Sequence, residues 1–486
     1  MKKAFISIIL ALAAVAGLHA ESFTGNIVVT RNGMTFNREV TVTVTPNENG
    51  LYTLNLSVPV FGTMVMSDVP AAMTGGVTVY SADRDVATSL GTMRTILFAR
   101  TVNGMMAANL SLPDQNATMW FNTVGNHFQL PNSDMEAWTN SNGEPDRWHG
   151  FKTATGALAS LSPAQLGKSE DIHEGATGQY SAVMTAKSIG TVANGTMTNG
   201  RLNAGSMIAT NTANHASMDE SYGDDFYMPI TAKPDQFKVW LKYQQGTANA
   251  NNKANVSVKT FDGTYYQEPV DKTYTNLSGS IVGGQIAACD WTQFTFSFDY
   301  DSYAANNAET KAIFVTFSTN ANPGQGSNND MLYVDDMELV YLGAITDLRY
   351  QGTTIEGWDP AVTTYSMEVE GEPNLDDFTA TIEGASAVLT KSMEQNADGS
   401  YRIAISVVSA DLQNAACYII NATVAASSRV GDVNDDGVVD IADVTDLIAR
   451  VLGNGQVIES RADINGDNMV DVGDVTELIG IVLGNN

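Results

Sequence analysis

The chain has few basic residues and only two cysteines. Its 25 Lys and Arg face 54 Asp and Glu, which gives a formal net charge of -29. Because binding to nucleic-acid phosphates needs clustered Lys and Arg, nucleic acid is excluded as a natural partner. Cys289 and Cys417 lie far apart, and each follows an Ala-Ala pair in an apolar stretch. Two buried free thiols are therefore favoured over a disulfide.

Long apolar runs are absent beyond the first residues. Residues 1–20 read MKKAFISIILALAAVAGLHA, with two lysines, an apolar run from Ala4 to Gly17 and a small residue at Ala20. This pattern predicts a Sec signal peptide cleaved before Glu21, because the run is too short to span a bilayer. No cysteine stands at the cleavage site to carry a lipid anchor. We therefore expect a secreted or periplasmic protein without a transmembrane segment.

Recognisable catalytic motifs are also missing. The sequence contains no Gly-x-Ser-x-Gly nucleophile turn and no phosphate-binding glycine loop. The histidines after the signal peptide do not lie at metal-ligand spacing from another His or Cys, and they are His127, His149, His173 and His215. A carboxylate pair for glycoside hydrolysis stays open as an alternative. The acids closest to aromatic residues are Asp219, Glu220, Asp224 and Asp225.

Period-two alternation runs through the chain from Glu21 to Ala426. Val40, Val42 and Val44, for example, alternate with threonines. Short runs of this kind, separated by Gly, Asn, Asp and Pro, are typical of antiparallel sandwiches and barrels. The sequence therefore predicts a mainly β, multidomain protein. The expected parts are a β-barrel or sandwich, a jelly-roll sandwich, an immunoglobulin-like sandwich and a small α-helical module.

A repeated unit near the C-terminus, at 431–453 and 462–484, carries the clearest motif. Each copy places oxygen-bearing side chains at loop positions 1, 3, 5, 9 and 12 and a backbone carbonyl at position 7, as an EF-hand-type calcium loop does. Gly437 and Asn468 suit the sharp turn of each loop. Two Ca²⁺ sites are predicted. Their ligands are Asp432, Asn434, Asp436, Val438, Asp440 and Asp443 in the first loop and Asp463, Asn465, Asp467, Met469, Asp471 and Asp474 in the second.

An apolar stripe at helical spacing follows each loop, and no comparable helix precedes it. This duplicated loop–helix unit, with Asp at position 12, resembles the dockerin domain. The resemblance implies that one helix face binds a cohesin-like protein. Positions 10 and 11 are Ile441-Ala442 and Val472-Gly473, where cellulosomal dockerins commonly carry a Ser-Thr-like pair. The alternative is a calcium-stapled module without such a partner.

Clusters of turn-forming residues divide the chain at 21–129, 130–342, 343–426 and 427–486. Residues 21–129 resemble small calycin-like β domains. Segments from NHFQLPNSDMEAW to MLYVDDMELVY, within 130–342, resemble the putative carbohydrate-metabolism domain, a jelly roll similar to carbohydrate-binding modules, which implies a glycan ligand. Residues 343–426, with the turn Trp358-Asp359-Pro360 before a Tyr-led strand, resemble immunoglobulin- or cadherin-like modules.

One strand pattern supports a glycan contact independently. Apolar residues alternate through 237–243, so Trp240 lies on the polar face between two lysines. Because sugar C–H faces stack on exposed aromatic rings, we expect Trp240 to bind carbohydrate, together with Trp138 and Trp148 in the opening loops. The alternative is that a loop or a neighbouring domain covers Trp240.

Three further acids predict a third Ca²⁺ site in the jelly roll. Glu136 lies at the expected first strand, and Asp335-Asp336 interrupts the last one. Asp inside a strand is disfavoured unless it is paired or bound to a metal. The alternative is a surface bulge with solvated carboxylates.

These features together predict a secreted, non-catalytic calcium-binding protein that recognises glycan or polysaccharide and docks into a carbohydrate-processing assembly. Two alternatives stay open: a structural adaptor without glycan binding, and a glycoside hydrolase that uses acids of the middle domain. An exposed aromatic strip near Trp240 would favour glycan binding, and a deep cleft with two facing carboxylates would favour the hydrolase.

Overall fold

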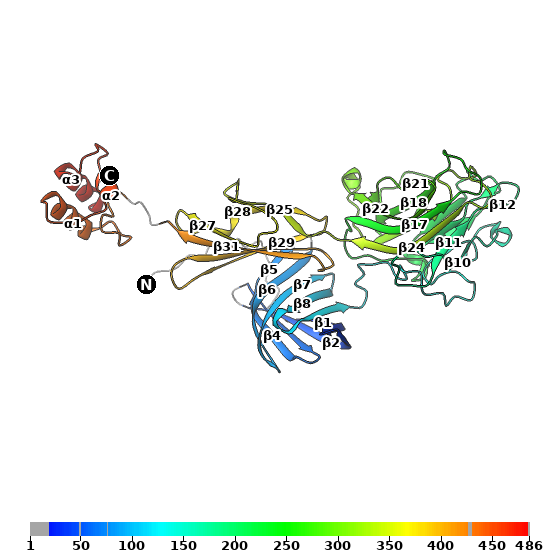
Figure 1. Ribbon diagram of the computed structural model, residues 1–486, viewed down its shortest axis with the longest axis horizontal. Coiled ribbons are helices and arrows are strands. Elements are labelled where there is room, and N and C mark those ends of the chain that lie inside the picture. The colour runs from blue at the N-terminus through cyan, green and yellow to red at the C-terminus, as the bar shows by residue number, and fades with distance from the viewer. Residues whose placement is uncertain (1–18, 48–49, 75, 426–429, 485–486) are drawn as a thin grey trace. The chain divides into compact units, whose positions relative to one another are not determined.

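The computed structural model describes residues 19–47, 50–74, 76–425 and 430–484 (Figure 1). Strands dominate, and the α-helices lie near the C-terminus, so the predicted mainly β class is confirmed. The predicted signal peptide lies outside the described residues except for its last two. Contacts divide the chain into two compact units. The first comprises Met1–Ile345, Ile382–Thr390 and Val407–Ala416, and the second comprises Thr346–Thr381, Lys391–Ser406 and Cys417–Asn486.

The N-terminal part of the first unit is one antiparallel sheet in the order β4-β3-β2-β1-β9-β8-β7-β6-β5. The sheet rolls so that β4 and β6 approach each other, and Arg84 in β6 donates hydrogen bonds to the carbonyls of Ser67 and Asp68 in β4. Alternate residues such as Val42 and Leu54 fill the interior. The strands are β1 (Glu21–Arg31), β2 (Met34–Pro46), β3 (Tyr52–Val58), β4 (Gly62–Val69), β5 (Ala71–Thr74), β6 (Val77–Thr88), β7 (Gly91–Val102), β8 (Met105–Leu112) and β9 (Ala117–Thr123).

The middle part of the first unit is a β-sandwich. Its main hydrogen-bonded path runs β10-β11-β24-β17-β22-β20-β18-β23-β14, and a smaller sheet contains β15, β16 and β19. Phe237, Val258 and Phe317 belong to its buried core. The strands are β10 (Leu166–Ser169), β11 (Ser181–Thr185), β12 (Lys187–Ser188), β13 (Val192–Ala193), β14 (Thr196–Thr198), β15 (Arg201–Ala204), β16 (Asn214–Met218), β17 (Gln236–Gln244), β18 (Ala254–Phe261), β19 (Tyr266–Glu268), β20 (Leu277–Ile281), β21 (Gln285–Ile286), β22 (Cys289–Asp299), β23 (Ala312–Ser318) and β24 (Met331–Val340).

Two small sheets follow, in the orders β26-β25-β28 and β27-β31-β30-β29, and β27 pairs with β31 in parallel. The turns at 382–390 and 407–416 group with the first unit, so the predicted 343–426 domain does not coincide with a separate contact unit. Cys289 and Cys417 form no disulfide, as predicted, and both are half-buried. The strands are β25 (Ala344–Tyr350), β26 (Thr353–Thr354), β27 (Thr364–Val369), β28 (Phe378–Glu383), β29 (Val388–Gln395), β30 (Tyr401–Val408) and β31 (Ala415–Val424).

The C-terminal module contains α1 (Ile441–Val451), α2 (Glu459–Ala462) and α3 (Val472–Val482). Asp440 and Asp471 cap the two longer helices, because each side chain accepts a backbone N–H of the first turn. The core of this module is small, and its buried members are Val433, Val444, Leu447, Ala462, Val475 and Leu478. A core of this size gives limited stability without a metal or a disulfide.

Candidate functional site

The sandwich of the first unit carries a groove over strands β14, β18 and β23. Its volume is about 540 Å³. Residues directly opposite each other on paired strands share a face of the sheet. The register therefore aligns polar side chains in two rows across the three strands, with neighbouring strands about 4.8 Å apart. One row contains Thr196, Ser318 and Asn255, and the next contains Thr198, Thr316 and Ser257. Thr198 is fully buried and its hydroxyl donates to the carbonyl of Val315, so the other five residues line the groove.

The amide of Asn255 and the hydroxyl of Ser257 face this groove. In β18 the flanking residues Val256 and Val258 are buried, so Asn255 and Ser257 point to the opposite side of the strand. Neither side chain makes a hydrogen bond to another residue within the described parts of the chain. Sequence reasoning missed this site. The signal was present as small polar residues at every second position in otherwise apolar strands.

Aliphatic side chains form the rim of the groove. Leu161, Met207 and Val270 line it and are 69%, 55% and 54% exposed. The ionisable residues of the lining are His215 and Glu268, and the Glu268 carboxylate lies 3.7 Å from the ammonium of Lys259. The groove thus combines a hydroxyl- and amide-rich floor, an aliphatic rim and little net charge.

Trp240, the predicted sugar platform, is covered on one ring face. It lies opposite Gln293 and Asp335 on the neighbouring strands, as expected for an outward-facing position. The imidazole of His173 stacks on the indole with 4.1 Å between ring centroids and 4° between planes. One ring face is therefore packed against a loop residue, as the alternative of a covering loop expected. Sugar binding at Trp240 stays a prediction.

Of the other two predicted platforms, Trp148 differs from expectation, and Trp138 stays a prediction. Trp148 is fully buried, and its indole N–H donates to the carbonyl of Pro131, so its assignment as a sugar platform is wrong. Trp138 is half-buried, with the ammonium of Lys168 5.9 Å from its ring centroid. Large aromatic rings in opening loops fill the core here, because that burial removes more apolar surface from water than a polar loop residue could.

The predicted third metal site is not assembled. The Glu136 carboxylate accepts hydrogen bonds from the backbone N–H groups of Gln179 and Tyr180, and Asp336 contacts His173 Nε2 at 2.7 Å. Among the described residues, these acids do not gather their oxygens as a metal-binding group would. Asp336 has φ +40° at a register shift between β17 and β24. This bulge directs the side chain of Asp336 toward His173, and the third Ca²⁺ site stays a prediction.

Asp335, the neighbour of Asp336, is a buried acid with an unusual ionisation. Burial and the adjacent Asp336 carboxylate raise the pKa of Asp335 to about 7. The charged form loses hydration in this site, and a second negative charge disfavours it further. The side chain accepts only the backbone N–H of Asp336 among the hydrogen bonds of the described residues.

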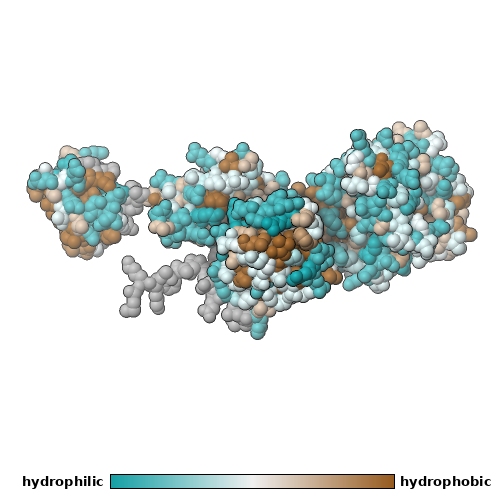
Figure 2. All heavy atoms as spheres, turned by 60° about the horizontal axis from the view of Figure 1, so that its bottom comes forward, coloured by the Kyte–Doolittle hydropathy of each residue, from teal (hydrophilic) through white to brown (hydrophobic). Residues whose placement is uncertain are grey.

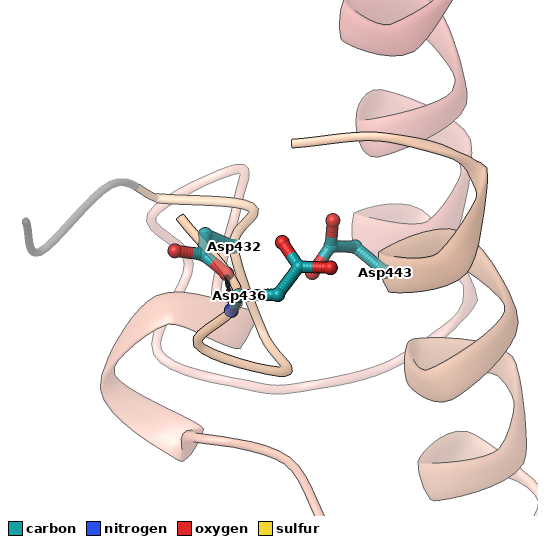
Figure 3. Close-up of side chains that lie close together, drawn as sticks. All are labelled: Asp432, Asp436 and Asp443. Carbon is teal, nitrogen blue, oxygen red and sulfur yellow. Dashed lines mark hydrogen bonds between the residues drawn. The ribbon is translucent and has the colours of Figure 1, made fainter. Parts of the chain in front are cut away.

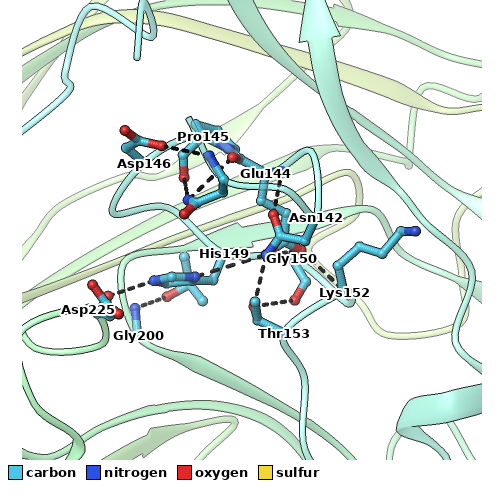
Figure 4. A network of polar contacts seen from close by, with 12 residues as sticks. Asn142, Glu144, Pro145, Asp146, His149, Gly150, Lys152, Thr153, Gly200 and Asp225 are labelled. Atoms are coloured by element: carbon cyan, nitrogen blue, oxygen red, sulfur yellow. Dashed lines mark hydrogen bonds and ion pairs between the residues drawn. The ribbon is translucent and has the colours of Figure 1, made fainter. Parts of the chain in front are cut away.

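The acidic loop proposed for hydrolysis does not form a carboxylate pair. Asp219 accepts the N–H of Ser221, while Asp224 and Asp225 are exposed. The carbonyl of Asp225 accepts a hydrogen bond from His149 Nε2 at 2.6 Å (Figure 4). This loop is therefore held through its backbone, and its carboxylates lie in solvent.

Glu144 forms the centre of the polar network in Figure 4. Its carboxylate accepts hydrogen bonds from Gly150 N, Lys152 N and Thr153 Oγ1 at 2.9–3.0 Å, and it lies 3.9 Å from His149 Nδ1. Burial raises the pKa of Glu144 and lowers the pKa of His149. Glu144 and His149 are both buried, so their contacts fasten the opening loop and the Glu144 carboxyl does not face a substrate.

The first predicted calcium loop brings three of its ligands together. Single oxygens of Asp432, Asp436 and Asp443 lie within 4.8 Å of one another (Figure 3). Gly437 has φ +84°, as its place at the sharp turn requires. Asp443 also accepts the N–H of Val433 at 2.8 Å, which fixes its carboxylate against the loop. Carboxylates so gathered fit Ca²⁺, which takes 6–8 oxygen ligands.

The second loop repeats the hydrogen bonds of the first. Asp463 Oδ1 accepts Asp467 N at 3.1 Å, as Asp432 Oδ1 accepts Asp436 N at 3.2 Å. Asn468 takes φ +67°, the conformation of Gly437. Among the described residues, the acids of the second loop do not bring their oxygens as close together as those of the first loop do. Burial acts to raise the pKa of Asp474, but the backbone N–H donors around it outweigh that effect and lower the pKa. The two loops thus share their backbone conformation and their pattern of hydrogen bonds. The remaining predicted ligands are Asn434, Val438, Asp440, Asn465, Met469 and Asp471.

Arg461 links the second loop to the first. It precedes Asp463 by two residues, and its side chain is 7% exposed. Its guanidinium donates to Asp435 Oδ1 at 2.7 Å, and to both the carbonyl and the Oδ2 atom of Asp432 at 3.2–3.3 Å. The repeat did not predict this bridge, because the second copy has no counterpart: Gly466 stands where the first has Asp435.

The C-terminal module exposes apolar side chains in matched pairs, and brown patches mark its surface at the left of Figure 2. Ile441 and Val472 are 67% and 70% exposed, and Leu452 and Leu483 are 71% and 68% exposed. The core of the module therefore buries only part of each predicted apolar stripe, and the rest of the stripe is exposed. Within the described residues, no helix has the length and apolarity to cross a membrane.

Comparison with known proteins gives similar solved structures and one matching protein family. None of the curated proteins compared matches this chain. A putative glycoside hydrolase from Bacteroides thetaiotaomicron is similar in structure, with 13% identity and a TM-score of 0.34, and the match covers 51% of this chain and 86% of that one. A tandem carbohydrate-binding module from Paenibacillus barcinonensis has 9% identity and a TM-score of 0.21, with 67% and 75% of the two chains covered.

A xylanase fragment from Clostridium thermocellum has 9% identity and a TM-score of 0.19, and the match covers 47% of this chain and 32% of that one. These low scores carry no argument about function. The match to a protein family covers a defined part of the chain, and that part includes the strands that form the groove. Over residues 114–340, the chain matches the family described as the putative carbohydrate metabolism domain.

Proposed function

We propose that this protein is a secreted, non-catalytic, calcium-binding protein that recognises glycan through the groove of its middle domain. The observation that carries the proposal is the pair of polar rows across β14, β18 and β23. Hydroxyls and amides at strand spacing match the regularly spaced hydroxyls of a sugar chain. The family match over residues 114–340 supports the same ligand class. The predicted tryptophan platforms are not part of the proposed site.

A glycan array followed by titration calorimetry of the full chain tests the proposal. The double variant Asn255→Ala/Ser257→Ala removes two polar groups from the floor and leaves the buried core untouched. Loss of one hydrogen bond typically costs about 1 kcal/mol, so we expect affinity to fall at least tenfold. Gln293→Ala, an exposed residue beside Trp240, is the matched control. Unchanged binding by the groove variant would reject the site.

The calcium part of the proposal rests on the two C-terminal loops. Each loop would hold one Ca²⁺ through its carboxylates, its Asn side chain and the carbonyl at position 7. The bound ion would neutralise acids that otherwise repel one another in a module with a small core. Ca²⁺ would therefore act as a structural support of the module and take no part in any reaction.

Docking is a second candidate function, and one observation favours it. The exposed apolar residues of the C-terminal module occur in equivalent positions of both copies, including Ile441 and Val472. A repeated surface of this kind suits a protein partner, and a cohesin-like domain is the partner that the dockerin resemblance implies. Surface plasmon resonance against immobilised cohesin domains tests it. Binding that survives Ile441→Asp/Val472→Asp would reject this surface as the contact, and no binding to any of them would favour the adaptor without a cohesin-like partner.

A hydrolase is the least supported candidate. The groove is lined by one carboxylate, Glu268, and this group is paired with Lys259. Hydrolysis needs two carboxyl groups at a defined separation on either side of the scissile bond. An assay of reducing ends released from plant and host polysaccharides distinguishes this candidate from simple binding.

A further inference from the structure

The charge of the groove restricts which glycans it can hold. Among the described residues no Lys or Arg lines it, so no permanent positive charge in its wall compensates a sulfate, a phosphate or a uronate. Its only carboxylate, Glu268, accepts a hydrogen bond from Tyr266 and is paired with Lys259 beyond the lining. A buried anionic group without a partner pays a large desolvation cost. An uncharged ligand therefore fits this groove better than an acidic one.

The apolar part of the lining restricts the ligand further. Phe151 is its one phenyl ring, and neither Trp nor Tyr contributes. Unsubstituted sugar rings gain most from flat aromatic faces, which this groove lacks. Leu161 and Met207 instead offer branched or flexible aliphatic surface that is largely exposed to water. Such surface is suited to methyl groups projecting from a sugar, because methyl burial gains about 0.8 kcal/mol, or roughly fourfold in affinity.

The floor and the rim thus recognise different parts of one molecule. Asn255 and Ser257 have unused hydrogen-bonding capacity for ring hydroxyls and for the oxygen of an acyl group. The aliphatic rim lies over loops that border the same strands, at Leu158, Leu161, Ile189 and Met207. A sugar chain along the floor would therefore direct its substituents toward the rim.

We infer that the groove selects an uncharged oligosaccharide that carries acetyl groups, with the sugar hydroxyls on the polar rows and the acetyl methyls against the rim. This inference rests on the proposed glycan-binding function and names its ligand class. Recognition of the acetyl group combines both halves of the site, because its carbonyl accepts a hydrogen bond while its methyl is buried.

Two tetrasaccharides that differ only in this substituent test the inference on the full chain. Chitotetraose and cellotetraose share the β-1,4 backbone, but the first carries acetamido groups where the second has hydroxyls. Burial of two methyl groups should make chitotetraose bind about tenfold more tightly. Equal affinity, or tighter binding of cellotetraose or of tetragalacturonate, would overturn the inference. If the preference for acetyl groups were absent but either neutral sugar still lost affinity in the Asn255→Ala/Ser257→Ala variant, the acetyl inference would fall. The proposed glycan-binding function would then stand.

A rim variant separates the acetyl contact from the floor contact. Leu161→Ser/Met207→Ser replaces two exposed residues and should bring the affinity for chitotetraose down to that for cellotetraose, about tenfold, while cellotetraose binding stays unchanged. Ile208→Ser is the matched control, because Ile208 is 65% exposed next to Met207 but does not line the groove. Equal losses for both sugars in the rim variant, or the same loss in the control, would contradict the assignment. Failure of every sugar to bind the groove would reject the proposed function as well.

Discussion

The imidazole of His173 lies flat on the indole of Trp240, with 4.1 Å between the ring centroids. Asp336 holds His173 in place at 2.7 Å from Nε2. Trp240 is thus a packing residue under a loop. We predict that Trp240→Ala lowers the free energy of unfolding by about 2 kcal/mol, because it removes a large half-buried ring. Glycan affinity should stay unchanged.

Urea unfolding and calorimetric titration of the same variant check this prediction. His173→Ala uncovers the ring without removing it, so it serves as the comparison and should destabilise less. A Trp240→Ala protein of normal stability that no longer binds glycan would return Trp240 to the binding site.

Asp335 makes the stability of the first unit depend on pH. Its pKa is about 7 in the folded chain and near 4 when unfolded, so the folded state binds the extra proton between these values. Stability should therefore fall as pH rises from about 4 to 7, with Asp336, His173 and Glu136 as the charged groups around it. Asp335→Asn should raise the free energy of unfolding at pH 8 by on the order of 2–4 kcal/mol.

Thermal unfolding at a series of pH values, at a constant concentration of chelator, measures the effect. Asp301→Asn, at an exposed turn, controls for the loss of one charge. A wild-type and an Asp335→Asn protein with parallel pH profiles would show that Asp335 ionises normally.

The calcium stoichiometry should respond to position 12 of the first loop and not to position 4. Asp443→Ala removes a carboxylate that lies with Asp432 and Asp436, so bound Ca²⁺ should fall from two ions to one. Asp435→Asn is the control, because Asn tolerates the φ of +62° at that position. Isothermal titration of the chelator-treated chain counts the ions. Two ions in Asp443→Ala would show that this group is not a ligand.

Arg461 should stabilise the first loop most when Ca²⁺ is absent. Its guanidinium neutralises Asp432, which is 1% exposed, and breaking such a buried pair costs about 3 kcal/mol. We predict that Arg461→Met lowers the thermal stability of the C-terminal module in chelator, and that saturating Ca²⁺ restores most of it. Arg450→Met is the control, because it gives the same change in net charge. An equal loss with and without Ca²⁺ would show that Arg461 acts through packing alone.

The clustering of acids in the first C-terminal loop could be predicted from the sequence because the geometry of the loop is local. All predicted ligands of this loop fall between Asp432 and Asp443, so spacing alone determines which oxygens meet. The mainly β class followed for the same reason, since period-two burial is a property of each strand by itself. The bridge from Arg461 to Asp435 lay beyond such reasoning, because it joins the two copies.

The groove and the covered tryptophan depend on contacts between distant segments. Asn255 meets Ser318, and Ser318 meets Thr196, only through the register of three strands far apart in the chain. The pattern at Trp240 correctly indicated an outward-facing position, but His173 comes from a loop whose path no local pattern reveals. Exposure on a strand face therefore did not imply exposure to solvent.

The most direct test of the central claim is a crystal structure of the full chain with a bound oligosaccharide. We predict sugar density over β18 and β23, with hydroxyls within hydrogen-bond distance of Asn255 and Ser257 and no contact to Trp240. Sugar bound on the side of Trp240 and Gln293, with the groove over β18 and β23 filled only by water, would contradict the account.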